Sequence, residues 1–478
     1  MKTMENKQFV QDIADMNTDF PQWYTDVVLK TDMVDYGPVK GTMVIKPYGY
    51  AIWENIQGYL DREFKKLGVQ NAYFPMLIPE SYLKKEAEHV EGFAPEVAVV
   101  THAGGEELAE KLIIRPTSET IICDMYSKWI KSYRDLPMVM NQWCNVMRWE
   151  KTTRPFLRTS EFLWQEGHTV QATPEDAERD TQVMLKTYSD CLKNLMAIPT
   201  LTGRKTANEK FAGAVATYGM EAIMKDGKCL QAGTTHDLGQ NFAKASNIRF
   251  LNKNGELEYG YSTSWGVSTR LIGALVMVHG DERGLRLPPN VAPIQVVIVP
   301  IASKKEGVLE KCQEVKELLE NNGIRVKLDD SNNTPGWKFN EYEMKGVPVR
   351  IEIGPRDIEN GIATIVRRDN FEKSQIALDG IEQSIAQVLS DIQENMYKQA
   401  CENFNSAIVE TDNYDEMVDA INNKKVALSY HCGESDCETE IKQNTTIKTR
   451  VIHSYDDTHK CIYCGKNSKY RVYFGKQY

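Results

Sequence analysis

The sequence predicts a multidomain protein in which an α+β region is followed by an α/β domain and a small cysteine-bearing domain. Three observations support this division. A chain of 478 residues is too long for one hydrophobic core. A proline-rich joint at residues 287–293 separates two regions with different patterns. Four of the ten cysteines lie close together near the end. We therefore expect units at 1–286, 294–399 and 400–478, with 287–293 as a linker.

Charge and targeting features are those of an ordinary globular protein. The net charge of -10 weakly disfavours a nucleic-acid partner but does not exclude one, because screening lets a local basic patch act on its own. No apolar run is long enough to span a membrane, and residues 1–17 lack the apolar segment of a secretory signal. We expect a cytoplasmic protein without a membrane partner.

Residues 46–67 are expected to form a helix. Pro47 stands near its start, apolar residues recur at i+4 spacing from Ile52 to Phe64, and Gly68 follows its end. A short strand over 69–74 then leads into Pro75. Core packing explains this pattern as well as function does.

Residues 141–168 are expected to form two strands joined by a basic loop. Arg148 and Glu150 are two positions apart, so on a strand they would share a face. Arginine, carboxylate and aromatic side chains on one sheet surface suit ATP, and a solvated hairpin with cross-strand ion pairs is the alternative. The returning strand places these residues on one face: Phe162, Trp164, Glu166 and His168.

Residues 261–284 combine a Gly/Ser/Thr-rich strand end with an apolar helix, and Arg270 stands at their junction. An arginine at this point can reach a polyphosphate that lies across the sheet. Arg270 could equally be a surface arginine at the start of a helix.

The region after the linker predicts an α/β domain with a mixed or parallel sheet. Residues 305–322 form its first helix, with one apolar face and Gly323 at its end. The expected strands are 294–301, 324–328, 347–353 and 363–368, and a further helix begins near residue 378.

Together, the three regions resemble the three motifs of class II aminoacyl-tRNA synthetases, which here contain Pro75, Arg148-Trp149-Glu150 and Arg270. Residues 115–120, 231–236 and 336–357 resemble prolyl-tRNA synthetases in particular. The terminal cysteines, and only about one hundred residues between Glu166 and Arg270, match the archaeal/eukaryotic-type subgroup, which has no editing insertion. The resemblance covers nearly the whole chain.

This resemblance implies a catalytic domain with an antiparallel sheet flanked by helices, then an anticodon-binding domain and a small α+β zinc-binding domain. It implies that L-proline is activated with ATP and Mg²⁺ to prolyl-adenylate and transferred to the 3′ end of tRNA(Pro) by a homodimer. A threonyl or glycyl enzyme of the same class, or a non-catalytic tRNA-binding paralogue, remains the alternative. Alanine should be misactivated, because an apolar pocket discriminates poorly against a smaller side chain.

The resemblance also assigns site residues, with Arg148 and Arg270 as the catalytic pair. The implied ATP site contains Arg148, Glu150, Arg158, Thr159, Phe162, Gln231, Thr234, Ser268 and Arg270. The implied proline site contains Thr117, Glu119, Arg148, Trp164, Phe211 and His236. Without the resemblance, His236 would be interpreted as a structural histidine hydrogen-bonded near Asp237.

The basic residues of the α/β domain are expected to be available for contacts with tRNA. A solvated charged face is the usual explanation of such charges. These basic residues are Lys338, Lys345, Arg350, Arg356, Arg367 and Arg368.

The terminal cysteines form two pairs with the spacing of zinc ligands, and a reducing compartment favours metal over disulfides. The predicted ligands of a structural zinc are Cys432, Cys437, Cys461 and Cys464, and His431, His453 or His459 could replace one of them.

Overall fold

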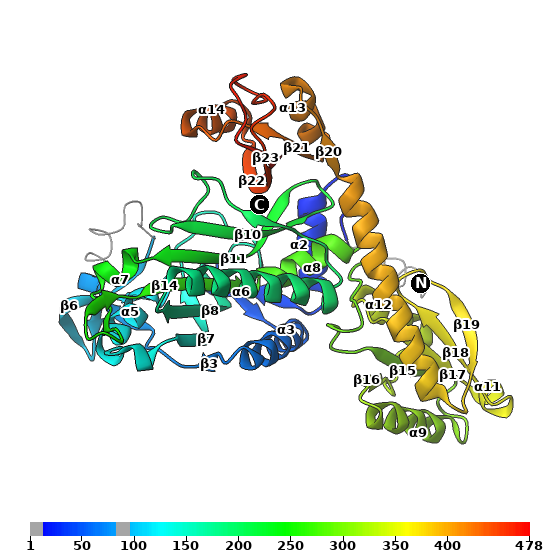
Figure 1. Cartoon of the computed structure of the whole chain (residues 1–478). Coiled ribbons are helices and arrows are strands. Elements are labelled where there is room, and N and C mark those ends of the chain that lie inside the picture. The colour runs from blue at the N-terminus through cyan, green and yellow to red at the C-terminus, as the bar shows by residue number, and fades with distance from the viewer. Residues whose placement is uncertain (1–12, 83–95) are drawn as a thin grey trace.

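The computed structural model describes residues 13–82 and 96–478 (Figure 1). Residues 1–12, which carry most of the segment examined for a secretory signal, and residues 83–95 lie outside the described part. Among the described residues, no helix has the length and apolar character needed to cross a membrane.

A seven-stranded sheet forms the centre of the first domain, in the order β3-β7-β8-β14-β11-β10-β9. Only β3 pairs in parallel, with β7, and every other neighbour is antiparallel. The expected antiparallel sheet is therefore confirmed. Its strands are β3 (Gln70–Asn71), β7 (Met138–Met147), β8 (Glu161–Gln171), β9 (Leu201–Arg204), β10 (Ala216–Ile223), β11 (Cys229–Gly239) and β14 (Tyr261–Ser268).

Helices cover this sheet because each presents an apolar stripe to it. The prediction for 46–67 is confirmed, since α3 begins at Pro47 and its side chains from Ile52 to Phe64 that point inward are fully buried. The predicted strand 69–74 is only two residues long, because the Phe74 N–H bonds to the Gln142 side chain instead of to a strand. The main helices are α2 (Phe20–Lys30), α3 (Pro47–Lys66), α6 (Pro174–Asn194) and α8 (Arg270–His279).

Smaller elements complete the domain. They are β1 (Val34–Tyr36), β2 (Met43–Ile45), β4 (Leu77–Pro79), β5 (Ala98–Ala103), β6 (Glu106–Ile114), α5 (Glu119–Trp129), η1 (Tyr133–Asp135), α7 (Asn241–Ala245), β12 (Arg249–Leu251) and β13 (Leu257–Tyr259). Between β8 and β14 the chain forms α6, three strands of the central sheet, α7 and the β12–β13 hairpin. These elements leave no separate editing domain in that described stretch.

The second domain has the predicted mixed sheet, in the order β16-β15-β17-β18-β19. The first three strands are parallel and the last two antiparallel. The inward residues of α9 are buried from Val308 to Leu319, and Gly323 follows with a φ of +77° that favours glycine. The elements are β15 (Val296–Pro300), α9 (Val308–Asn321), β16 (Val326–Leu328), α10 (Pro335–Met344), β17 (Val349–Ile353), α11 (Pro355–Glu359), β18 (Ile362–Arg367), β19 (Lys373–Ala377) and α12 (Ile381–Ser406).

The helix α12 runs from the second domain to the third and continues across the boundary expected at residue 400 (Figure 1). The third domain has a four-stranded sheet in the order β20-β21-β23-β22 and lies beside β10 in Figure 1. Its elements are β20 (Ile408–Glu410), α13 (Tyr414–Asn422), β21 (Val426–His431), α14 (Ser435–Thr445), β22 (Lys448–Tyr455) and β23 (Tyr470–Gly475).

Candidate active site

A cleft of about 290 Å³ opens over the central sheet. Side chains of β8, β11 and β14 line it, together with residues from 209–217, the start of α5 and Arg148. All six residues assigned to proline line this cleft, together with three of the nine residues assigned to ATP, and Arg148 belongs to both sets; the other six ATP residues, Arg270 among them, do not line it. The residues of the two sets that line it are Thr117, Glu119, Arg148, Trp164, Phe211, His236, Gln231 and Thr234.

Glu166 is the centre of the hydrogen bonds beneath the cleft and is almost completely buried. Its carboxylate accepts from the Thr117 hydroxyl at 3.0 Å and from the Ser118 N–H at 3.1 and 3.0 Å, and it bonds the His168 ring at 3.0 Å. Burial alone would raise the pKa of Glu166, but the bonds from His168 and Ser118 lower it to about 2. The carboxylate is therefore ionised, and it holds the segment that carries Glu119.

His236 forms part of the wall beside Phe211, whose ring centroid is 4.7 Å away. Its Nδ1 bonds the Thr217 hydroxyl at 3.0 Å, whereas the Asp237 carboxylate accepts from the Gly239 N–H. The structural alternative, a bond near Asp237, is not what the fold provides. Burial lowers the pKa of His236 to about 3, so the ring is neutral near pH 7 and adds no positive charge to the wall.

Arg148 lies at the edge of the cleft, just past the end of β7. Its Nε donates to the carbonyl of Pro116 at 3.0 Å, and its guanidinium lies 5.3 Å from the Trp164 ring and 5.5 Å from the Phe162 ring. The expectation that Arg148 and Glu150 share a strand face is wrong, because β7 ends at Met147 and the chain turns into the loop.

Glu150 instead pairs with the Arg158 Nε at 2.9 Å, so two residues assigned to ATP neutralise one another in this state. Thr159 is buried, and its hydroxyl donates to the Glu161 carbonyl at 2.7 Å. Phe162 packs edge-on against Trp164, with centroids 6.0 Å apart.

Arg270 is the first residue of α8, as predicted, and its N–H donates to Ser268 Oγ at 3.2 Å. Its guanidinium donates to the carbonyl of Leu157 at 3.1 Å. Burial, and then the charges of Arg148 and Arg158, lower the pKa of Arg270 below its ordinary value. Three arginines thus lie close enough to repel, which is the electrostatic setting of a polyanion site.

Several lining residues were absent from the predicted site. The alternation along β8 already placed Glu166 and His168 on the face of Trp164, so this signal was available. Glu209 and Thr217 come from an irregular connection and the start of β10, where no periodicity predicts direction. The missed residues are Glu166, His168, Glu209, Thr217, Ser264, Trp265 and Gly266.

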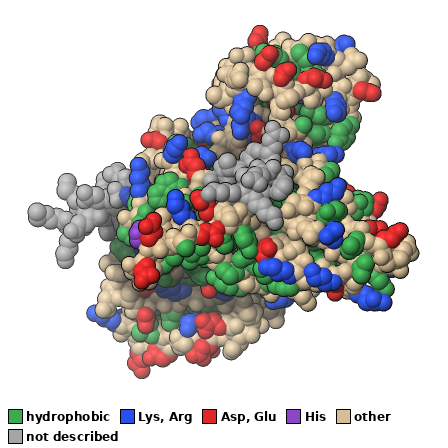
Figure 2. Space-filling model, turned by 90° about the vertical axis from the view of Figure 1, so that its left-hand side faces the viewer, with side chains coloured by type: hydrophobic (Ala, Val, Ile, Leu, Met, Phe, Trp, Pro, Cys, Tyr) green, Lys and Arg blue, Asp and Glu red, His purple; other side chains and the backbone are tan. Residues whose placement is uncertain are grey.

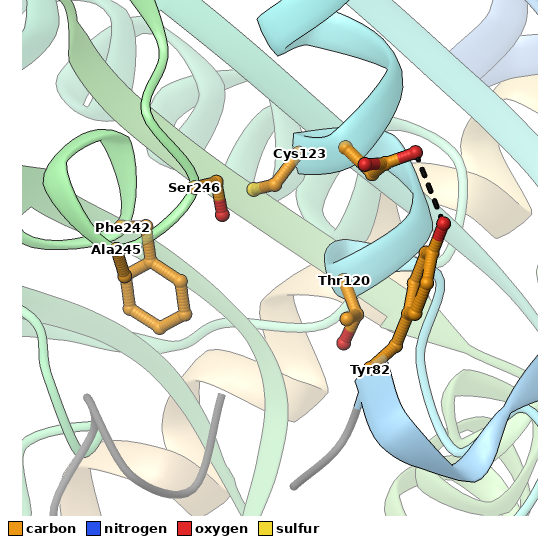
Figure 3. A pocket seen from close by; sticks show the side chains of 7 residues that line it. Tyr82, Thr120, Cys123, Phe242, Ala245 and Ser246 are labelled. Atoms are coloured by element: carbon orange, nitrogen blue, oxygen red, sulfur yellow. Dashed lines mark hydrogen bonds between the residues drawn. The ribbon is translucent and has the colours of Figure 1, made fainter. Parts of the chain in front are cut away.

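A second, smaller pocket lies between α5 and α7 (Figure 3). Its lining includes Cys123 and Phe242, and the Tyr82 hydroxyl at its edge donates to Asp124 at 3.4 Å. No residue predicted for the site lines it. We assign it no role.

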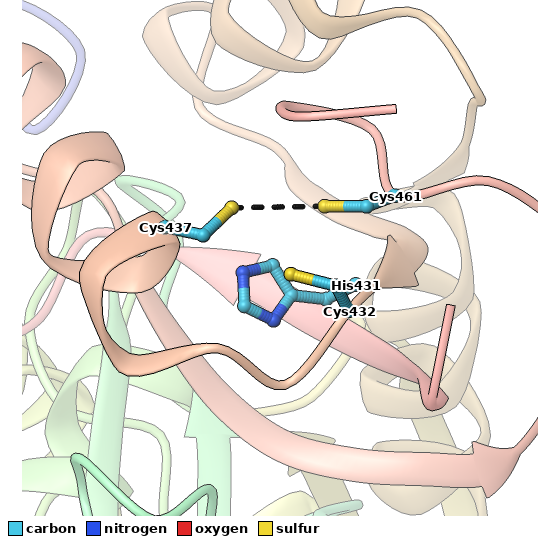
Figure 4. Close-up of side chains that lie close together, drawn as sticks. All are labelled: His431, Cys432, Cys437 and Cys461. Carbon is cyan, nitrogen blue, oxygen red and sulfur yellow. Dashed lines mark hydrogen bonds between the residues drawn. The ribbon is translucent and has the colours of Figure 1, made fainter. Parts of the chain in front are cut away.

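The third domain gathers thiols and an imidazole (Figure 4). Ligand atoms of His431, Cys432, Cys437 and Cys461 all lie within 4.8 Å of one another. The sulfur of Cys464 lies 3.6 Å from that of Cys432, and the sulfurs of Cys437 and Cys461 are 3.7 Å apart. Tetrahedral zinc with Zn–S bonds of about 2.3 Å sets sulfurs about 3.8 Å apart, so the donor set fits zinc.

His431 suits a ligand role less well than Cys464. Its Nδ1 accepts from the Gly433 N–H at 3.0 Å, which leaves the ring proton on Nε2 in the neutral form. The other two candidate histidines lie outside this cluster: His453 is exposed, and His459 stacks on Tyr430 with its Nδ1 bonded to a carboxylate.

Five of the six basic residues expected to be available for tRNA are engaged within the protein. Carboxylates pair with them in each case, and Lys338 and Arg368 are also buried. The pairs are Lys338–Asp329, Lys345–Glu341, Arg350–Glu352, Arg367–Asp369 and Arg368–Asp281. Arg356 is exposed, and no carboxylate of the described residues pairs with it.

Three features define a class II aminoacyl-tRNA synthetase: the antiparallel sheet, the two arginines Arg148 and Arg270 beside it, and the mixed-sheet domain that follows in the chain. Family models agree with this class. Residues 100–279 match the tRNA synthetase class II core domain (G, H, P, S and T), and residues 295–387 match an anticodon binding domain.

The particular family follows from the whole chain. Residues 414–478 match the C-terminal domain of prolyl-tRNA synthetase. The chain is 58% identical to a proline–tRNA ligase of Alkaliphilus oremlandii and 55% identical to proline–tRNA ligase 2 of Clostridioides difficile, in each case over 99% of both chains. A crystal structure of prolyl-tRNA synthetase from Cryptosporidium parvum, in complex with halofuginone and AMPPNP, superposes with a TM-score of 0.94 at 41% identity, covering 99% of this chain and 98% of that one.

The chain belongs to the prolyl-tRNA synthetase family, and its activity is that of a proline–tRNA ligase.

Proposed function

We propose that the cleft forms prolyl-adenylate through Arg148 and Arg270, before proline is transferred to tRNA(Pro). The observation that carries this proposal is the electrostatic contrast within one cleft. Arg148, bonded to a main-chain carbonyl, lines the cleft together with the carboxylates of Glu119 and Glu166. Arg270 is bonded to a carbonyl in the same way and lies close enough to Arg148 for their charges to repel. An amino acid brings a carboxylate and a cation, and its orientation follows from this contrast.

Activation joins the proline carboxylate to the α-phosphate of ATP and expels pyrophosphate. The two anions repel, so the protein acts by neutralising charge and by positioning. In the proposed roles, Arg148 bridges the carboxylate and the α-phosphate, and Arg270 holds the distal phosphates that Mg²⁺ accompanies. The remaining ATP contacts are the residues assigned from the resemblance, from Glu150 to Ser268.

The proline end of the cleft suits a secondary ammonium and a small ring. The Thr117 hydroxyl donates to Glu166, so its oxygen can accept from the ammonium together with Glu119. The rings of Trp164, Phe211 and the neutral His236 surround the apolar part. Because these walls exclude by size alone, alanine is expected to enter.

Amino-acid-dependent pyrophosphate exchange tests this function. Proline should support rapid exchange and alanine weak exchange. Exchange with threonine but not proline would contradict the assignment of the cleft.

We propose that the enzyme is a homodimer. The apolar face of α3 cannot supply the interface, because it is buried in its own domain. Exposed apolar side chains come instead from β1, β2, β4, β5 and the connections beside them: Tyr36, Val39, Val44, Tyr73, Leu77 and Val99. Figure 2 shows apolar side chains gathered on the side of the molecule that carries β6 and α5.

Sedimentation at micromolar concentration should show two copies. The Tyr73→Glu/Leu77→Glu variant should sediment as a monomer, because it places charge on this surface. A wild-type monomer would contradict the proposal.

We propose further that the cysteine cluster holds one structural zinc through Cys432, Cys437, Cys461 and Cys464. Protein purified without added zinc should contain about one equivalent per chain. Cys464→Ser should reduce the metal content far more than His431→Gln, and the reverse order would identify His431 as the fourth ligand.

The division at 286, 293 and 399 remains our proposal for the domains, with the tRNA anticodon meeting the second one. The ten free thiols and the tRNA substrate favour the cytoplasm as the place of action.

A further inference from the structure

One wall of the cleft depends on an irregular segment. Residues 205–211 form the first part of the connection from β9 to β10 and carry the lining residues Glu209 and Phe211. The Lys205 N–H donates to the Thr217 carbonyl at 2.8 Å, and the Glu209 N–H closes a turn at 3.2 Å on the carbonyl of Thr206. A segment with few main-chain bonds of its own keeps a fixed shape only when its surroundings hold it.

From the cleft side, Thr217 holds this segment. The Phe211 N–H donates to the Thr217 hydroxyl oxygen at 3.0 Å, and that hydroxyl also bonds His236. The position of Phe211 is therefore linked to that of its neighbour in the wall, His236.

From the other side, the C-terminal domain holds the segment through a buried cluster. The Thr206 hydroxyl donates to Glu438 at 2.8 Å and lies 3.0 Å from the Thr449 hydroxyl, which bonds the same carboxylate. All three side chains are buried. A buried carboxylate is costly without donors, so this contact strongly favours one position of Thr206.

Further contacts join the C-terminal domain to other residues of the 205–211 segment. The Asn208 amide donates to the Ser435 carbonyl at 3.0 Å and accepts from the Ser435 hydroxyl at 2.7 Å. Lys448 lies 3.6 Å from the carboxylate of Glu209. At the start of the segment, Lys205 pairs with Glu221, which also binds the fully buried Arg450 of β22; this network is Lys205–Glu221–Arg450.

We propose that the C-terminal domain positions the Phe211 wall of the proline site, and so sets the affinity for the amino acid. No residue of that domain lines the cleft among the described residues, so it acts through residues 205–211. Ser435 and Glu438 lie on either side of Cys437 at the start of α14. A metal ion held by the Cys437 thiolate would therefore fix the turn from which Ser435 contacts Asn208 and Glu438 contacts Thr206. The proposal rests on the assignment of the cleft to proline.

The double variant Thr206→Val/Asn208→Ala tests the proposal. Valine keeps the shape of threonine but removes its donor, and the exposed Asn208 loses both bonds to Ser435. The KM for proline should rise about tenfold, which corresponds to about 1.4 kcal/mol. The KM for ATP and kcat should stay within about twofold, because the arginines are untouched. Calorimetric titration with proline should show the same loss of affinity without turnover.

Thr411→Val is the matched control. The Thr411 hydroxyl donates to the Glu416 carboxylate at 2.7 Å within the same domain, so the variant removes the same kind of bond away from residues 205–211. Its KM for proline should not change.

An unchanged KM for proline in the folded double variant would overturn the proposal, and so would an equal rise in the KM values for proline and ATP. If the double variant does not fold, Asn208→Ala alone decides, with a rise of about threefold expected and no rise contradicting. A wild-type enzyme without proline-dependent exchange would instead contradict the proposed function.

Discussion

Arginines occupy two different environments in the catalytic cleft and in the anticodon-binding domain. At the candidate active site, the Nε atoms of Arg148 and Arg270 donate to the main-chain carbonyls of Pro116 and Leu157. No carboxylate of the described chain forms an ion pair with either guanidinium. The carbonyls hold the side chains in place and leave their positive charge for a ligand.

In the anticodon-binding domain, carboxylates neutralise the corresponding side chains. Arg350 donates twice to Glu352, at 3.1 and 2.9 Å, and Arg367 forms a two-bond pair with Asp369 at 2.9 and 2.8 Å. Each of these arginines is paired with a carboxylate two positions further along the chain. They contribute little to a field that would attract RNA.

The difference teaches that the partner of an arginine, and not its presence, decides its use. Arginine and carboxylate stand two positions apart in both 350–352 and 148–150. On β17 this spacing makes an ion pair, because both side chains leave the same face of a strand. At Arg148 it makes none, because β7 has already ended at Met147.

The largest effect is expected for Arg148→Ala. Each charge-assisted contact to a buried anion contributes about 1.5–3 kcal/mol, and a bridging arginine makes several, so exchange should fall by about 10³-fold or more. The melting temperature should change little. Arg350→Ala is the control, with exchange near the wild-type rate, and near-normal exchange in Arg148→Ala would remove Arg148 from the mechanism.

Arg368→Ala should show the next largest effect, on stability. This buried side chain joins the anticodon-binding domain to Asp281 through two bonds of 2.7 Å. Its loss leaves a partly buried carboxylate, which should cost about 2–3 kcal/mol in denaturant unfolding. Arg283→Ala breaks an exposed pair with Glu343 and should cost less than about 1 kcal/mol. Equal losses of stability in the two variants would show that the buried Arg368–Asp281 pair contributes no more than the exposed Arg283–Glu343 pair.

Arg356→Glu tests whether an exposed cation of the anticodon-binding domain binds tRNA, in contrast to the cations that pair with carboxylates of the same protein. Arg356 is exposed, so its reversal should raise the KM for tRNA several-fold, more at low salt than at high salt. Proline-dependent exchange without tRNA should not change. If aminoacylation is equally unaffected, this surface does not meet the tRNA.

His279 is a buried base, and no carboxylate of the described residues pairs with it to stabilise its charged form. Burial lowers its pKa to about 3, and its Nε2 bonds the Met196 carbonyl. Between pH 6.5 and 3 the unfolded chain binds the proton that the folded chain refuses, so stability falls as the pH falls. From pH 7 to 5 this residue should contribute a loss of about 2 kcal/mol. His279→Gln should be less stable at pH 7 but should lose less on acidification, and parallel pH profiles would contradict the assignment.

Local patterns carried much of the fold and part of the candidate site. The spacing in α3 and α9 and the strand-to-helix junction at Arg270 predicted elements that the structure contains. The alternation along β8 placed Trp164 and Glu166 on one face. Strand ends were less predictable, because a single bond to a side chain, such as that from the Phe74 N–H to the Gln142 amide oxygen, can end a ladder.

By itself, the sequence determined the order of the domains, the elements with a regular period, the motif arginines and the cysteine spacing. These features depend on residues within a few turns of one another, so short-range periodicity encodes them. Tertiary structure alone decided which arginines remain charged toward a ligand, that Glu209 joins the cleft, and that Glu438 holds Thr206 across 232 positions of the chain. The reason is that such contacts form only when separately folded surfaces dock, and no local pattern records the register of that docking.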